Sequence, residues 1–105
     1  MSVKQKLLNK ELSIGSWVTI GHPNIIDIMA TASLDWLVID MEHTSITIDV
    51  CQTLISIIQG HGITALVRVP ENEPTIIKKV LDCGADGIVV PMVNSKSDAE
   101  KAVSA

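Results

Sequence analysis

Apolar positions along the chain follow two spacings, one typical of short buried strands and the other of helices with one apolar face. Four apolar runs have the length of a strand, and they cover residues 14–20, 36–40, 63–69 and 87–90. Between these runs, apolar residues recur three or four positions apart, which predicts helices over residues 24–32, over residues 47–60 and from residue 74 to a stop at residue 84. The order is therefore a strand followed by a helix, repeated along the chain.

Helix boundaries are marked by residues that favour helix starts and stops. Pro23 and Pro74 suit the first turn of a helix, because the amide hydrogen that proline lacks has no partner there. Gly60 and Gly84 suit the ends of the helices before them. A short leading helix is predicted over residues 3–10, and Ser95 with Asp98 resembles a capping box at the start of a last helix.

This order predicts an α/β protein with parallel strands, since the strands are apolar on both faces. Two architectures fit: an open doubly wound sheet, or four βα units that form the N-terminal half of a TIM (β/α)8 barrel. Closing a barrel takes about eight strands, so four strands cannot close one. Residues 1–105 are interpreted as one partial barrel domain. It is expected to be truncated at the C-terminus, because the helical pattern near Ala105 has no terminator.

Composition narrows the classes of partner. The net charge is −4, the pI is near 5.1, and no basic cluster is larger than Lys78-Lys79, which argues against nucleic acid or an anionic membrane. No stretch approaches the roughly 20 apolar residues of a membrane span, so a cytoplasmic location is expected. Cys51 and Cys83 have no neighbouring cysteine or suitably spaced histidine and are interpreted as small buried hydrophobes.

Ionisable residues gather where two predicted strands end. Asp40 ends the second strand, Glu42 and His43 follow it, and Arg68 lies near the end of the third. In both architectures the carboxyl ends of parallel strands form the edge where ligands bind. A buried arginine needs a carboxylate partner or an anionic ligand. Asp40 or Glu42 could therefore form a salt bridge with Arg68 that supports the site from behind. His43 could also be a solvated loop histidine.

A histidine beside an arginine suits chemistry in which an enolate forms next to a carboxylate. The imidazole moves a proton near neutral pH, and the guanidinium holds developing negative charge. A Schiff-base lysine is poorly supported, because every lysine falls on a predicted helix or near a terminus. A metal ion is the alternative electron sink, although Asp40 and Glu42 alone give a weak signal for one.

Three stretches resemble the HpcH/HpaI aldolase/citrate lyase family, and specifically its pyruvate-dependent class II aldolases. They are Trp36 to His43, Leu66 to Pro70, and Val80 to Met92. The resemblance covers nearly all of this chain but under half of a family member. It implies a (β/α)8 barrel, usually a homo-oligomer (a hexamer), that cleaves or forms 4-hydroxy-2-oxo acids, with pyruvate and an aldehyde as the other reactants. It also implies a divalent metal, Mg²⁺, Mn²⁺ or Co²⁺, in the full-length protein.

The resemblance assigns roles to three residues. His43 is expected to be the general acid/base, and Arg68 to bind substrate and steady the pyruvate enolate. Asp82 matches a carboxylate that raises the basicity of the histidine. Since Asp82 lies near the end of a helix, on the rim opposite His43, contact would require a neighbouring subunit. The family's metal ligands fall beyond Ala105, so the chain alone is expected to bind no metal and to be inactive unless complemented.

Two functions from other classes remain open. One is a non-catalytic half-barrel that associates with itself. The other is a small-anion-binding α/β module, with its site at the Gly21-His22-Pro23 turn before a helix.

Overall fold

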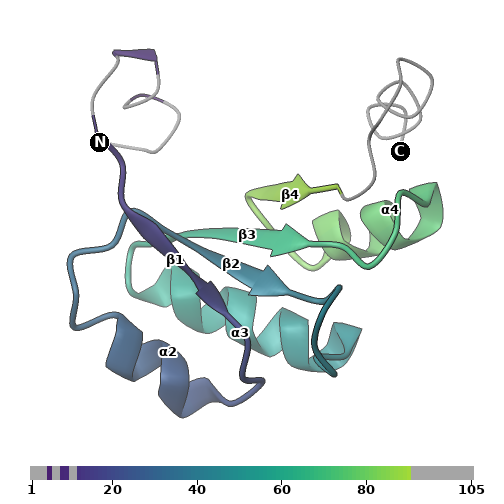
Figure 1. The fold of residues 1–105 in the computed structure, drawn as a ribbon, viewed down its shortest axis with the longest axis horizontal. Helices are drawn as coiled ribbons and strands as arrows, with labels where there is room; N and C mark the ends of the chain where they lie inside the picture. Colours follow the sequence, from purple (N-terminus) through teal and green to yellow (C-terminus); the bar gives the residue numbers. More distant parts are fainter. Residues whose placement is uncertain (1–4, 6–7, 10–11, 91–105) are drawn as a thin grey trace.

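The architecture comes from a computed structural model that describes residues 5, 8–9 and 12–90. The strands are β1 (Gly15–Val18), β2 (Trp36–Asp40), β3 (Thr64–Arg68) and β4 (Gly87–Val89). The helices between them are α2 (Pro23–Met29), α3 (Ile48–Gly60) and α4 (Pro74–Asp82). Strands and helices alternate along the described chain (Figure 1), which confirms the predicted order. The predicted last helix lies outside the described residues, and so does most of the predicted helix over residues 3–10.

All four strands are parallel and lie in the sheet in the order β1-β2-β3-β4. The prediction of a parallel α/β sheet is therefore confirmed. A doubly wound sheet reverses its strand order at a switch point, and this sheet has no such reversal. Strands that follow one another without reversal are the arrangement of consecutive βα units in a (β/α)8 barrel.

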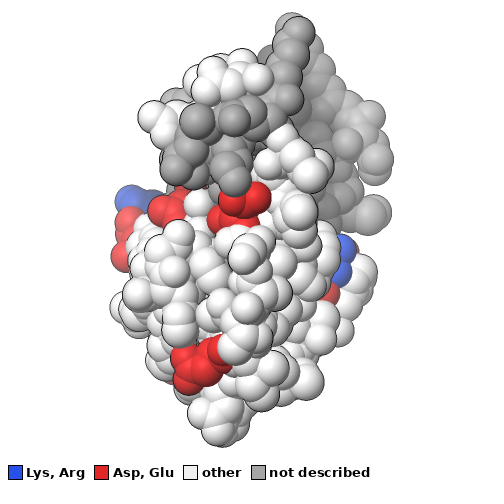
Figure 2. Space-filling model, turned by 90° about the vertical axis from the view of Figure 1, so that its left-hand side faces the viewer, with Lys and Arg blue, Asp and Glu red and all other residues white. Residues whose placement is uncertain are grey.

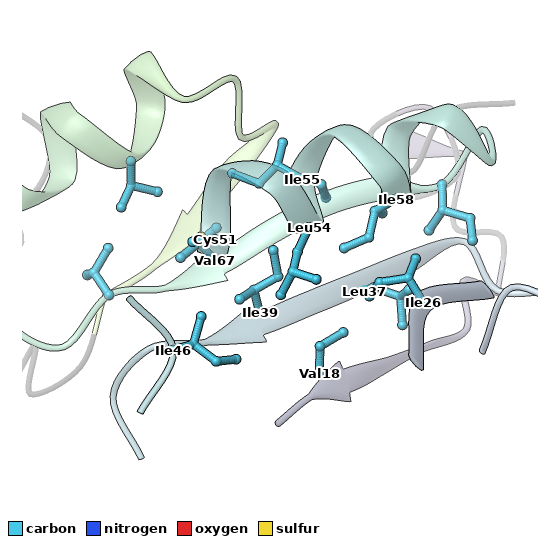
Figure 3. Close-up of a cluster of buried hydrophobic side chains, with 14 of the residues drawn as sticks. Val18, Ile26, Leu37, Ile39, Ile46, Cys51, Leu54, Ile55, Ile58 and Val67 are labelled. Atoms are coloured by element: carbon cyan, nitrogen blue, oxygen red, sulfur yellow. The ribbon is translucent and has the colours of Figure 1, made fainter. Parts of the chain in front are cut away.

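The hydrophobic core lies between one face of the sheet and the helices. Figure 3 shows Leu54 and Ile58 of α3 close to Leu37 and Ile39 of β2. Val18 of β1 belongs to the same buried cluster, together with Ala65, Val67, Ile77 and Val80. Because side chains alternate along a strand, the register places a second set on the opposite face: Trp17, Val38, Asp40, Leu66, Arg68 and Val89.

The residues at the helix starts explain where the helices begin. Pro23 and Pro74 are the first residues of α2 and α4, as predicted. Thr47 caps α3 by accepting a hydrogen bond from the backbone N–H of Val50. Glu73 caps α4 and accepts from the N–H groups of Thr75 and Ile76, which otherwise have no partner within the helix.

The prediction for α2 is wrong in two details. The helix ends at Met29 rather than near Ala32. The spacing of apolar residues over 24–32 predicts that Ile25, Ile28, Met29 and Ala32 share one apolar face, but Ile28 is 65% exposed. Ile26 is fully buried instead. Two residues along a helix turn the side chain by about 200°, so Ile26 and Ile28 point in nearly opposite directions.

The surface around α2 and β1 is mostly uncharged. Figure 2 shows separate acidic groups on this face and no large cluster of Lys or Arg. None of the helices in the described part of the chain is long and apolar enough to cross a membrane.

Candidate functional site

Arg68 and Asp40 form an ion pair where β2 and β3 end. The register pairs Asp40 directly with Arg68 on the sheet face that carries Trp17 and Val38. The guanidinium donates from Nε to Asp40 Oδ1 at 3.1 Å and from Nη2 to Oδ2 at 2.6 Å. This two-point contact holds the guanidinium in one orientation. The arginine predicted to need a carboxylate partner therefore has one, and that partner is Asp40.

The Asp40 carboxylate is nearly inaccessible, with 3% of the residue exposed. Besides Arg68 it accepts hydrogen bonds from the backbone N–H groups of Glu42 and His43, at 2.9 and 3.1 Å. The hydrogen bond from Arg68 lowers the pKa of Asp40 below its usual value, and the two backbone donors act in the same direction against the effect of burial. The same contact raises the pKa of Arg68. The pair is thus fully charged near neutral pH.

The loop after β2 is folded back onto the strand end by short-range hydrogen bonds. The Thr44 hydroxyl donates to the carbonyl of Asp40 and accepts from the N–H of Ile46. Together with the two N–H groups on the Asp40 carboxylate, these bonds make a compact turn of the kind that Asp and Thr favour. The turn places His43 beside Arg68, while the His43 side chain stays 66% exposed to solvent.

His43 contacts both Arg68 and Glu42. Nδ1 of the imidazole lies 2.9 Å from Arg68 Nη2, and Nε2 lies 3.4 Å from Glu42 Oε1. A guanidinium only donates hydrogen bonds, so Nδ1 is the acceptor and a neutral ring carries its proton on Nε2, towards Glu42. Glu42 also lies near the arginine, with Oε2 3.4 Å from Arg68 Nε. The expected meeting of His43 and Arg68 at one strand edge is present.

The guanidinium of Arg68 lies over the ring of Trp17, a contact that the sequence alone did not indicate. The Arg68 Cζ atom lies 4.5 Å from the centroid of the Trp17 ring, within the range of a cation–π interaction. The available signal was strand alternation, which puts Trp17 and Arg68 on one sheet face once the register of β1 is known. Thr44 was also missed, and its signal is a hydroxyl four residues after Asp40.

Asp82 is not near this cluster within one chain. It is the exposed last residue of α4. Because α4 leads back to the start of β4, the end of the helix lies at the amino ends of the strands. His43 lies at their carboxyl ends, so the opposite-rim position expected from the sequence is the observed one.

The remaining histidines and cysteines lie outside the site. His22 caps α2, its Nδ1 accepting from the N–H of Asn24, so it occupies the turn considered for an anion. His61 Nε2 lies 2.9 Å from Asp27 Oδ1. Burial raises the pKa of the Cys51 thiol to about 12, in agreement with its interpretation as a hydrophobe. Cys83 is only partly buried, which corrects the expectation of full burial.

The described residues do not fit a divalent metal ion. No group of three or more His, Cys, Asp or Glu side chains among residues 12–90 is arranged to hold one. The carboxylates of Asp40 and Glu42 both face the Arg68 guanidinium, whose positive charge opposes a cation between them. What the cluster offers is an acid/base imidazole beside a fixed guanidinium.

Comparison with known proteins gives consistent matches. The family described as HpcH/HpaI aldolase/citrate lyase matches residues 13–105. A 5-keto-4-deoxy-D-glucarate aldolase of Escherichia coli O139:H28 is 37% identical over 101 residues, which make up 96% of this chain and 40% of that protein. The chain therefore spans about 40% of the length of the curated relatives it matches.

Solved structures match the fold over the same region. The crystal structure of an HpcH/HpaI aldolase from Desulfitobacterium hafniense DCB-2 superposes with a TM-score of 0.88 at 31% identity, covering 98% of this chain and 40% of that one. The citrate synthase SbnG gives a TM-score of 0.91 at 35% identity, with 97% and 42% of the two chains covered. In each case the match leaves more than half of the larger protein without a counterpart.

Proposed function

Because the chain belongs to the HpcH/HpaI aldolase/citrate lyase family, we propose that it supplies the acid/base and anion-binding groups of a carbon–carbon lyase. The substrate class is a 4-hydroxy-2-oxo acid, which is cleaved to pyruvate and an aldehyde. The single observation that carries this proposal is the 2.9 Å contact between His43 Nδ1 and Arg68 Nη2 at the edge of the sheet. It puts a proton acceptor and a fixed cation within reach of one small molecule.

His43 moves the proton in this proposal. The lone pair of the neutral ring lies on Nδ1, where it accepts from Arg68 Nη2. The substrate's 4-hydroxyl group displaces this hydrogen bond, and Nδ1 takes the hydroxyl proton as the C3–C4 bond breaks and the aldehyde leaves. The electron pair of that bond passes into the C2 carbonyl and gives the enolate of pyruvate. The imidazolium that forms is stabilised by Glu42, 3.4 Å from Nε2. Return of the Nδ1 proton to C3 yields pyruvate and restores the neutral ring.

Arg68 stabilises the enolate oxygen. Its Nε and Nη2 atoms donate to Asp40, and Nη2 also faces His43. The hydrogen bonds of Arg68 within the described residues use Nε and Nη2, and the proposal assigns Nη1 to the carboxylate or enolate oxygen of the substrate. A donor fixed in advance stabilises the charge that develops in the transition state. Asp40 is the supporting carboxylate that fixes it.

The proposed activity belongs to a protein that contains more of the barrel than this chain. The divalent ion generally required by the family, Mg²⁺, Mn²⁺ or Co²⁺, finds no set of ligands among the described residues. We therefore expect the 105-residue chain to show no turnover by itself. The proposal includes a cytoplasmic homo-oligomer, in which Asp82 reaches His43 from a neighbouring copy of the chain.

A chimeric enzyme tests the proposal. Residues 13–105 would replace the matching segment of the Escherichia coli aldolase, which is 37% identical. Pyruvate release from a 4-hydroxy-2-oxo acid would be followed with Mg²⁺ or Mn²⁺ present. The chimera is expected to turn over, and His43→Ala to lower kcat by about 10²–10⁴-fold, the usual contribution of a general acid/base.

Arg68→Lys and Lys78→Gln complete the set. Lysine at position 68 keeps the positive charge but loses the planar fork, so kcat should fall by about 10- to 100-fold. Lys78 is an exposed residue of α4, which packs on the other face of the sheet, so its variant should match the parent. Unchanged turnover in His43→Ala would refute the assigned role, and a folded chimera without pyruvate release would refute the substrate class.

A further inference from the structure

Arg68 is restrained on two sides by different chemistry. Its edge is held by the Asp40 carboxylate and the His43 imidazole. Its Cζ atom also lies over the indole ring of Trp17, 4.5 Å from the ring centroid. Trp17 comes from β1, so the contact crosses β2 to reach an arginine on β3.

The register explains how the ring reaches the guanidinium. Trp17 is paired with Val38, which lies between Trp17 and Leu66 on the same face of the sheet. Valine is small and leaves room for a large ring to lie across β2. Trp17 is also 40% exposed, unlike the core residues on the other face. A tryptophan that is only partly buried, over a charged group at the ligand-binding edge, is poorly explained by core packing alone.

We propose that Trp17 is a positioning residue that holds the Arg68 guanidinium flat, so that the Nη1 edge faces the substrate. This proposal rests on the proposed function, in which Nη1 binds the enolate. Asp40 alone fixes two nitrogens but allows the guanidinium plane to tilt about that contact. The ring restrains this tilt, because a planar cation stacks on an aromatic face. Trp17 therefore acts through Arg68 and does not itself react.

Arg68 is the only arginine in the sequence, which makes the contact directly measurable. In the ¹⁵N-labelled chain the arginine Nε–Hε group gives one NMR signal, and a ring stacked on the guanidinium displaces that signal upfield. The displacement should be lost in Trp17→Leu and partly retained in Trp17→Phe. Trp36→Phe is the matched control, because Trp36 lies at the opposite end of β2, against Gly15.

An arginine signal at the same position in the parent and in both Trp17 variants would overturn the proposal. If Trp17→Leu does not fold, the position of the arginine Nε–Hε signal in Trp17→Phe tests the proposal. A change in the arginine signal that exceeds the change in Trp36→Phe supports the contact, and a change no larger than the control overturns it.

The kcat and KM of Trp17 variants in the chimeric enzyme give a second test of the positioning role. Trp17→Leu should lower kcat by about tenfold, the rate equivalent of a cation–π contact. KM should change little, because the tilt matters most where charge develops. Trp17→Phe should recover part of the loss. A rise in KM with unchanged kcat would contradict positioning. The two proposals can fail separately. If Trp17 displaces the arginine NMR signal but the parent chimera shows no turnover, the restraint of Arg68 by Trp17 is supported and the proposed lyase function is refuted.

Discussion

Asp40 joins three parts of the site through its side chain and its backbone carbonyl. It holds Arg68, it accepts the backbone N–H groups of the loop that carries His43, and its own carbonyl accepts from Thr44. Removing its charge therefore affects both the guanidinium and the loop. Such a buried carboxylate contributes to stability as well as to the geometry of the site.

Asp40→Asn should lower the free energy of unfolding at pH 7 by about 1–3 kcal/mol, because a charged hydrogen-bonded acceptor is lost. The folded-state pKa of Asp40 is lowered. Its contribution is thus fully present above the unfolded value of about 3.9 and is lost as pH falls through the folded value. Urea unfolding at pH 7 and near pH 3 measures this. The difference between parent and variant should shrink in acid, and a difference independent of pH would contradict the assignment.

The sequence predicted which residues gather at this edge but not all of their contacts. Asp40, His43 and Arg68 follow from their positions at strand ends, since parallel strands place their carboxyl ends together. Trp17 could not be placed in the same way. Its face depends on the register between β1 and β2, and a shift of one residue would reverse every side chain of β1.

At the scale of elements, close packing between β1 and β2 fixes that register. Gly15 is paired with Trp36, and a Cβ atom at Gly15 would lie 1.9 Å from Trp36 Cδ2. Only glycine lets the indole lie against β1 here. The first residues of α2 and α4 and the last residue of α3 were predictable, because proline and glycine act locally. The exposed Ile28 was not, because the inward face of a seven-residue helix is chosen by its neighbours.

Gly15→Ala should destabilise the chain by about 1–3 kcal/mol, as expected for overpacking against a rigid ring. Gly60→Ala is the matched control, since Gly60 ends α3 and an added Cβ meets nothing within 4 Å. It should be neutral or stabilise by up to about 1 kcal/mol. Urea unfolding of both variants measures the effect. Equal stabilities would show that the contact of Gly15 with Trp36 does not constrain the sheet.

At the scale of the molecule, the four strands make an uninterrupted parallel series with helices packed on one face. The opposite face carries the site residues together with Val38, Leu66 and Val89. In a complete (β/α)8 barrel this face would be the interior, and the strand ends would open onto the catalytic mouth. The alternation of strand and helix spacings along the sequence predicted this layout. The rest of the barrel has no counterpart in these residues and is seen only in the longer relatives, of which this chain covers about 40%.

In the proposed function, His43 and Arg68 together create and protonate a pyruvate enolate. The most direct measurement is exchange of the methyl protons of pyruvate for deuterium in D₂O, followed by ¹H NMR with the chimeric enzyme and Mg²⁺ or Mn²⁺. Exchange requires the enolate but no aldehyde. The account predicts exchange by the parent and loss of exchange in His43→Ala and Arg68→Lys. Exchange at the parental rate in His43→Ala would contradict it.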